Sequence, residues 1–233
     1  MNKRRLLTLL AVLASATPLS FLGATDAQAQ AAPKASAKTS PVAPRKEQIQ
    51  AIVQEAYNKF KSDTRGKNAD YIPALAQVDP NLFGIAVVST NNQVVTVGDV
   101  KSTFSIQSIS KVFSLALAME EQGSAKVFEK IGSEPTGRPF NSPIAVVDMP
   151  THTGNPLVNA GAIATVSLVS AKSADEKWQK ILSFYSKAAG EKLTIMDDVY
   201  KSEAATNTGN KALSYLLAKY DRIYSDPFES VDV

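Results

Sequence analysis

The chain has 233 residues, 44% of them hydrophobic, which is enough to bury the core of one domain. It has 25 Lys and Arg, 22 Asp and Glu, one histidine and no cysteine. The lack of cysteine excludes disulfides, thiol nucleophiles and cysteine-based zinc sites, and one histidine excludes a multi-histidine metal centre. We therefore expect no metal site.

The N-terminal segment Met1–Ala29 has the pattern of a secretory signal peptide. Three basic residues precede the apolar run Leu6–Ala16, which is too short to span a bilayer. Ala27-Gln28-Ala29 then supplies the small residues of a cleavage site. We expect a periplasmic or secreted protein with no membrane association after cleavage. The pair Arg4-Arg5 leaves both the general and the twin-arginine export routes open.

Removal of this segment changes the charge balance of the chain. Three of the 25 basic residues and one of the 22 acidic residues lie in it, so the remainder has a net charge of +1. The next segment, Gln30–Arg45, is rich in Ala, Pro, Lys and Ser and predicts a disordered linker. It adds basic residues and no acid, so the domain that begins at Lys46 is slightly acidic. A nucleic-acid partner is therefore not expected.

The predicted domain, 46–233, begins with an amphipathic helix and a hairpin. Five apolar residues recur at helical spacing, namely Ile49, Ile52, Val53, Ala56 and Phe60. A loop over Gly66–Pro73 leads to two β-rich runs, Leu82–Ser89 and Gln93–Val97, on either side of Asn91-Asn92. This arrangement predicts an antiparallel β-hairpin.

Helices dominate the rest of the chain. The first is predicted over Ser108–Gln122, closed by Gly123, with an apolar stripe of Ile109, Val112, Phe113, Ala116 and Met119. Gly132–Leu157 has several Pro and Gly and predicts a long irregular stretch, which is unusual unless it lines a site. Three more helices are predicted over Asn159–Ser170, Asp175–Ala189 and Ser202–Tyr220. The order favours an α+β fold with helices packed on an antiparallel sheet.

Ser108-Ile109-Ser110-Lys111 is the one Ser-x-x-Lys of the chain. Residues three apart share a helix face, so a desolvated lysine with a lowered pKa could activate the serine. The helix N-terminus would favour a developing oxyanion. By itself the pattern fits an ordinary serine cap followed by a surface lysine equally well. A triad would have to use His152, and a lone loop histidine is more often a surface residue.

The surroundings of this motif add a resemblance. Phe104–Phe113 is similar to the active-site segment of the serine-dependent glutaminases. Further matching stretches follow in the family's order: Ala69–Pro73, Gly132–Gly137, Phe140–Ser142, Asn155–Ile163, and Ser202-Glu203 followed by Asn210. Together they extend from about Lys46 to the C-terminus. The resemblance implies a β-lactamase/transpeptidase-like fold and hydrolysis of L-glutamine to L-glutamate and ammonia, with no metal or cofactor. It also implies a homo-oligomer, either a dimer or a tetramer.

The resemblance also implies roles for seven residues. Ser108 matches the nucleophile and Lys111 its activating lysine, while Tyr71 matches a tyrosine that lines the pocket with a catalytic role. The residues that match the substrate-binding set are Tyr71, Gln107, Ser108, Asn159, Glu203 and Asn210. Glu203 and Asn210 are seven residues apart, which would place them on one face of a single helix.

Three of these residues also have a structural alternative. Glu203 fits an acid that complements a helix dipole, Asn159 fits a turn residue or helix cap after Pro156, and Tyr71 fits a structural aromatic before Pro73. The types nevertheless suit glutamine, because a carboxylate can pair with its ammonium group and amides can bind its polar groups.

The chain departs from the family pattern after Val233, where family members continue. Their further segments carry two more site tyrosines and a strand whose N–H completes the oxyanion hole. From the sequence we expect a C-terminally truncated domain, with an incomplete sheet and little activity by itself, because losing one oxyanion donor typically lowers the rate about 10²–10³-fold. Two smaller departures are Gly209, where the family usually has arginine, and Thr136, where serine is more usual.

Two other functions share some of these features. A β-lactamase or peptidoglycan peptidase also uses Ser-x-x-Lys after an export signal, but its Ser-Asp-Asn element does not occur in this chain. A non-catalytic periplasmic module that binds glutamine is the second alternative. Opening of a chromogenic β-lactam would indicate the first, and glutamine binding without turnover would indicate the second.

Overall fold

The structure, a computed structural model, describes residues 44–233. The predicted signal peptide, Met1–Ala29, and most of the predicted linker lie outside the described residues. The helices and strands, in chain order, are α1 Lys46–Phe60, α2 Pro73–Ala76, β1 Gly84–Val88, β2 Val94–Gly98, a 3-10 turn Gln107–Ile109, α3 Ser110–Gln122, α4 Ser124–Ile131, α5 Pro143–Asp148, α6 Asn159–Ser167, α7 Ala174–Ala189, α8 Asp197–Thr206, α9 Thr208–Lys219 and α10 Glu229–Asp232. None of the helices in this part of the chain is both long and apolar enough to cross a bilayer.

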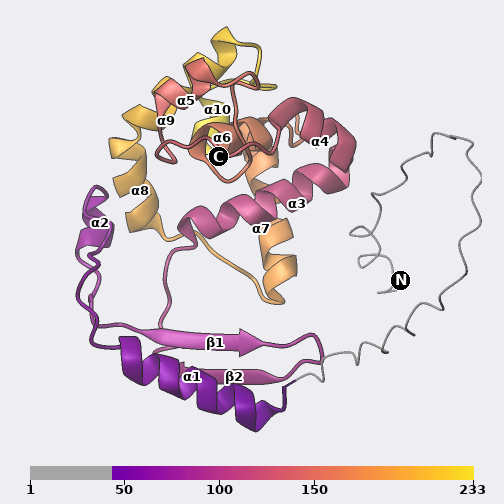
Figure 1. Cartoon of the computed structure of the whole chain (residues 1–233). Coiled ribbons are helices and arrows are strands. Elements are labelled where there is room, and N and C mark those ends of the chain that lie inside the picture. Colours follow the sequence, from indigo (N-terminus) through magenta and orange to yellow (C-terminus); the bar gives the residue numbers. More distant parts are fainter. Residues whose placement is uncertain (1–43) are drawn as a thin grey trace, which may run out of the picture. The chain divides into compact units, whose positions relative to one another are not determined.

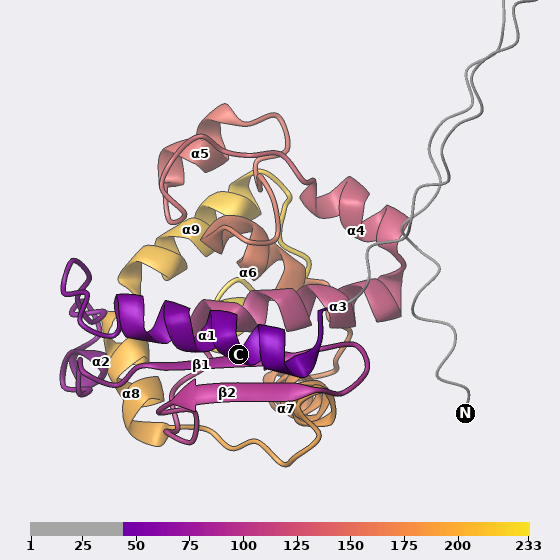
Figure 2. The ribbon, with the colours of Figure 1, turned by 60° about the horizontal axis from the view of Figure 1, so that its bottom comes forward.

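The predicted hairpin forms a two-stranded antiparallel sheet that α1 covers (Figure 2). Its register pairs Val87 with Val95 and Val88 with Val94. Since successive side chains of a strand point to opposite faces, these two pairs lie on opposite sides of the sheet. Val95 is 2% exposed, whereas Val88 is 68% and Val94 is 52% exposed. Among the described residues, therefore, one face of the hairpin is covered and the other is open.

The helices pack around α6, which lies against α3, α4, α9 and α10 (Figure 1). The main hydrophobic cluster consists of Ala118, Val127, Ile131, Val146, Ala160, Ile163, Ala164, Leu168, Leu213 and Leu217. The small residues of α6 allow this close packing, because they occupy little volume between four neighbouring helices. The helix predicted over Asn159–Ser170 is therefore confirmed, although it ends at Ser167.

The predicted apolar stripe of α3 is partly wrong. Ile109 and Val112 are more than half exposed, and the buried residues of the helix are Ser114, Leu117 and Ala118. Gly123 closes the helix as predicted, with a φ of 81° that favours glycine. The helix is apolar on more than one face, so spacing alone could not identify which face the neighbouring helices cover.

The stretch Gly132–Leu157 is less irregular than predicted, because it contains α5. This six-residue helix has Pro143 at its start, and the Ser142 hydroxyl accepts a hydrogen bond from the Ala145 N–H. The short helix α4, directly after Gly123, was not predicted either. Both helices are shorter than the window over which helical periodicity is read.

The single helix predicted over Ser202–Tyr220 is wrong, because the chain forms two helices, α8 and α9. Asn207 ends the first and begins the second with a backbone φ of −84° and ψ of 17°. Asparagine favours helix ends because its side chain can bond to nearby backbone groups. The break separates Glu203 from Asn210, so the prediction that they share a face of one helix is also wrong.

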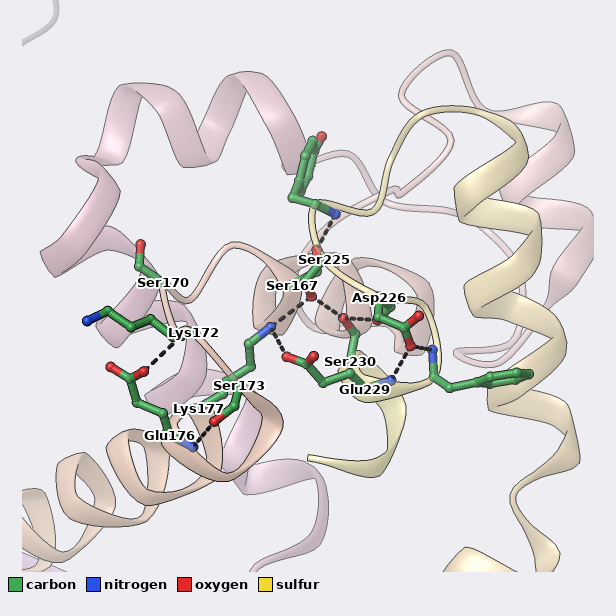
Figure 3. A network of polar contacts seen from close by, with 12 residues as sticks. Ser167, Ser170, Lys172, Ser173, Glu176, Lys177, Ser225, Asp226, Glu229 and Ser230 are labelled. Atoms are coloured by element: carbon green, nitrogen blue, oxygen red, sulfur yellow. Dashed lines mark hydrogen bonds and ion pairs between the residues drawn. The ribbon is translucent and has the colours of Figure 1, made fainter.

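A buried lysine ties the last residues of the chain to α7 (Figure 3). Lys177 is 1% exposed, and its Nζ lies 2.8 Å from Ser225 Oγ and 3.2 Å from Glu229 Oε1. The Ser225 and Ser230 hydroxyls are in turn 2.7 Å apart. A buried ammonium group is stable only with such partners, so this network fixes α10 against the helical core.

Candidate active site

The serine and lysine of the Ser-x-x-Lys motif lie within hydrogen-bonding distance. Ser108 is in the 3-10 turn that leads into α3, and Lys111 is in the first turn of α3. Lys111 Nζ lies 3.0 Å from Ser108 Oγ. The residue before the serine, Gln107, has a φ of 45°, a left-handed conformation that non-glycine residues rarely adopt and that is often found at functional sites. Ser108 is exposed, so a ligand can reach its hydroxyl.

A chain of hydrogen bonds continues from Lys111 to two other helices. Its Nζ donates to Asn159 Oδ1 at 2.7 Å, and Asn159 Nδ2 donates to Asn210 Oδ1 at 2.9 Å. Asn159 is the first residue of α6, and Asn210 is in the first turn of α9. Three helices therefore present Ser108, Lys111, Asn159 and Asn210 as one connected group.

The environment of Lys111 makes its amine easier to deprotonate than that of a lysine in water. Burial lowers the pKa of Lys111, because the charged amine loses contact with water. Its Nζ lies 5.8 Å from the centre of the Phe140 ring, and the Phe140 carbonyl accepts the Asn159 N–H at 2.8 Å. Phe140 thus contacts both Lys111 and the asparagine that holds it. The sequence placed Phe140 in a matching segment but assigned it no role.

Glu203 enters the site from α8. Its Oε2 accepts a hydrogen bond from the Gln107 Nε2 at 3.4 Å, and Gln107 is bonded covalently to Ser108. Within residues 44–233, no ion pair involves the Glu203 carboxylate. Glu203 is half-buried, and its carboxylate, which contacts the residue before the serine, can accept a cationic group.

Tyr71, unlike the other six predicted site residues, has no hydrogen bond to another residue of the site. It is 68% exposed and lies in the segment just before α2. That segment is linked to the site indirectly, because α2 packs against α8, the helix of Glu203. The Ala74 N–H of α2 also donates to the Ser202 hydroxyl of α8 at 3.1 Å.

His152 is not the plain surface residue that the sequence predicted. Its ring stacks on Tyr220 with the centroids 3.8 Å apart, and its Nδ1 lies 2.7 Å from the Val146 carbonyl oxygen. These contacts give it a structural role at the end of α5, and no hydrogen bond of the described residues links it to Ser108. Residues 44–233 also hold no group of three potential metal ligands.

One contact with the serine turn had no signal in the sequence. The Tyr185 hydroxyl of α7 donates to the Ser110 carbonyl at 3.1 Å and lies 2.5 Å from Ser114 Oγ. Burial raises the pKa of Tyr185, so the phenol keeps its proton and remains a donor. Tyr185 lies in the helix predicted over Asp175–Ala189, and no local pattern indicates which helix it reaches.

An accessible serine hydroxyl beside a desolvated lysine, with amides and a carboxylate around it, is an arrangement suited to acyl transfer through a serine ester. Serine–lysine hydrolases use a serine and a lysine in this arrangement. A model described as Glutaminase matches residues 66–233, and the chain belongs to the glutaminase family.

Individual relatives agree with this assignment. The chain is 53% identical over 183 residues to a glutaminase of Colwellia psychrerythraea, with 78% of this chain and 59% of that relative covered. It is 46% identical over 187 residues to a glutaminase of Bacteroides fragilis, with 80% and 58% covered. The chain therefore spans somewhat less than three fifths of the length of these relatives.

Solved structures show the same fold. The structure of a probable glutaminase, ybaS, superposes with a TM-score of 0.76 at 44% identity and covers 79% of this chain and 60% of that one. A probable glutaminase from Bacillus subtilis, complexed with 6-diazo-5-oxo-L-norleucine, has a TM-score of 0.66 at 29% identity, with 85% and 59% covered. The predicted α+β, β-lactamase-like class is confirmed by this similarity.

Proposed function

We propose that this protein hydrolyses the side-chain amide of L-glutamine to L-glutamate and ammonia, with Ser108 as the nucleophile. The observation that carries the proposal is the Ser108–Lys111–Asn159 chain of hydrogen bonds in a member of the glutaminase family. The glutamine-binding alternative would use the same Glu203, Asn159 and Asn210 groups, and release of ammonia distinguishes the proposal from it.

The first half of the reaction forms an ester. Neutral Lys111 accepts the proton of the Ser108 hydroxyl, and Oγ attacks the carboxamide carbon of glutamine. The Lys111 ammonium then returns the proton to the leaving nitrogen, so that ammonia departs and a γ-glutamyl ester of Ser108 remains. The Asn159 amide keeps Lys111 Nζ directed at Ser108 throughout, since its Oδ1 accepts a hydrogen bond from Nζ.

The second half releases the product. Water attacks the ester carbon as Lys111 accepts a proton from it, and the proton passes to Ser108 Oγ as the C–O bond breaks. L-Glutamate leaves, and Ser108 and Lys111 regain their starting protonation. Neither step requires a metal or an organic cofactor.

Recognition of glutamine follows from charge and hydrogen-bonding capacity. The carboxylate of Glu203 pairs with the substrate ammonium, and Gln107 orients that carboxylate. Asn159 and Asn210 offer amide groups to the polar groups of glutamine. Tyr71 lines the pocket from the segment before α2, although it makes no hydrogen bond in this part of the chain.

The proposal is tested by covalent labelling and by ammonia release. 6-Diazo-5-oxo-L-norleucine should modify Ser108, and glutamine should protect it. Ser108→Ala should abolish labelling and any release of ammonia from glutamine. Ser110→Ala is the matched control, because it removes a hydroxyl from the same turn. Labelling that survives Ser108→Ala, or that glutamine does not slow, would contradict the proposal.

We also propose export and self-association. The pattern of Met1–Ala29 supports a periplasmic or secreted location, and its test is the N-terminal sequence of the protein recovered from a cell fraction. The family resemblance supports a homo-oligomer, which light scattering of the purified chain would measure.

A further inference from the structure

The inference concerns Ser202, the residue before Glu203, and it rests on the proposed function. We infer that Ser202 is a positioning residue of the glutamine site, whose hydroxyl holds the Tyr71-bearing segment against the Glu203-bearing helix. The hydroxyl accepts the Ala74 N–H of α2 at 3.1 Å, across 128 residues of sequence.

The sequence at the start of α2 explains why the Ala74 N–H needs the Ser202 hydroxyl. The first N–H groups of a helix have no partner within the helix and are usually capped by a side chain at the N-cap position. In α2 that position is held by Ile72, which has no capping side chain, and Pro73 follows it. Ala74 therefore takes its cap from a distant helix instead of from its own sequence.

No second hydrogen bond of the described residues supports the one between Ala74 and Ser202. Among residues 44–233, it is the one hydrogen bond that joins the segment 61–82 to the helices after residue 100. Its other polar contacts are internal, such as Asn68 Nδ2 to the Val78 carbonyl at 2.6 Å and Lys67 to Asp70 at 2.6 Å, or join it to the end of α1 at Tyr57 and Phe60. The packing of α2 on α8 and the burial of Ile72 remain without the Ser202 hydroxyl, so its loss should loosen the segment without disturbing its own contacts.

Ser202 stands between the two proposed ligand-binding positions. Glu203 follows it directly on α8, and Tyr71 lies three residues before the Ala74 that it caps. A shift of α2 away from α8 would move Tyr71 away from the Glu203 carboxylate. The hydrogen bond thus controls the distance between Tyr71 and Glu203, the two residues proposed to bind glutamine from the segment before α2 and from α8. Ser202 itself does not contact the substrate.

Limited proteolysis measures the link independently of activity. Arg65 and Lys67 are exposed trypsin sites within the segment. In Ser202→Ala, cleavage after these residues should become about five- to tenfold faster, as loss of one part-buried hydrogen bond raises the open population. Ser202→Thr, which keeps a hydroxyl, should restore the parental rate. Thr206→Ala is the matched control, because the Thr206 hydroxyl bonds only to carbonyls of α8.

The functional test measures the KM and kcat for glutamine and the labelling of Ser108 by 6-diazo-5-oxo-L-norleucine. Ser202→Ala should raise the KM for glutamine about fivefold with a smaller change in kcat, since ground-state contacts are affected. An unchanged cleavage rate, or faster cleavage with an unchanged KM, would overturn the inference. Failure of the proposed function is seen separately, as absence of Ser108 labelling in the parent chain, and the proteolysis still shows whether Ser202 holds the segment.

Discussion

Lys111 contacts the nucleophile and an amide at the same time, so the protonation of this one residue decides what Ser108 can do. As an ammonium group it can only donate to Ser108 Oγ and Asn159 Oδ1. As a neutral amine it can accept the serine proton while it still donates to Asn159. Burial lowers the pKa of Lys111, which makes the neutral form accessible at lower pH.

We predict that the rate of Ser108 labelling rises with pH and reaches half its maximum below the ordinary titration range of lysine. The sign follows because the lowered pKa of Lys111 increases the fraction of neutral amine at any given pH. Lys111→Arg, which stays charged, should lower the rate by about 10²–10⁴ at all pH values. The measurement is the second-order labelling rate between pH 6 and 10, as an approximate working range. A parental rate in the arginine variant would refute the role of Lys111.

The sequence predicted most of the residues that the structure brings together here, because the Ser-x-x-Lys motif and the amides each stand in a short matching segment. The structure adds which atoms meet, such as Asn159 with both Lys111 and Asn210. The roles of Phe140 and Tyr185 could not be predicted. Each depends on how a loop or helix distant in sequence packs against α3, and no local spacing records that.

At the scale of elements, α6 depends on a glycine in its first turn. A Cβ added to Gly161 would lie 1.9 Å from the Asn155 carbonyl oxygen, far inside van der Waals contact. The loop that precedes α6 can therefore approach the helix only because residue 161 lacks a side chain. This close approach fixes the position of Asn159, two residues earlier.

We predict that Gly161→Ala lowers the free energy of unfolding by about 1–3 kcal/mol, as typical for overpacking against backbone. Gly209→Ala is the control, because no atom lies within 4 Å of an added Cβ there. Alanine should stabilise α9 at that position by up to about 1 kcal/mol, since it is the better helix former. Urea unfolding followed by Trp178 fluorescence measures both. Equal stability of the two variants would contradict the proposed close approach.

The elements that the sequence predicted are the long ones. The helices over 46–60, 110–122 and 174–189 give several turns of periodicity, and the hairpin is marked by its turn residues. The short helices α2, α5 and α10 give too few residues for a period to be read. The break at Asn207 was missed although Asn207, Thr208 and Gly209 all favour helix ends over helix interiors.

At the scale of the whole described unit, the helical core and the β-hairpin differ in how much of their apolar surface is buried. The helices around α6 share a continuous core, whereas the hairpin has one covered face and one open face. A two-stranded hairpin is marginally stable by itself and depends here on α1. Its stability should therefore be lower than that of the helical core.

We predict that the amides of β1 and β2 exchange hydrogen at least about tenfold faster than those of α6. The reason is that local opening of the hairpin exposes less apolar surface than opening of the core does. Hydrogen exchange followed by mass spectrometry, with peptides from Gly84–Gly98 compared with peptides from Asn159–Ser167, makes the measurement. Equal protection of the two regions would show that they open as one cooperative unit.

The stacking of His152 on Tyr220 has a practical consequence. Since the chain has one histidine, its two carbon-bound imidazole protons give one isolated pair of signals in a proton NMR spectrum. The ring of Tyr220, 3.8 Å away, displaces those signals by its ring current. The two residues belong to segments more than 60 positions apart, at the end of α9 and in the loop after α5. The protein thus contains a built-in spectroscopic reporter, which registers without any label whether this side of the helical core is intact.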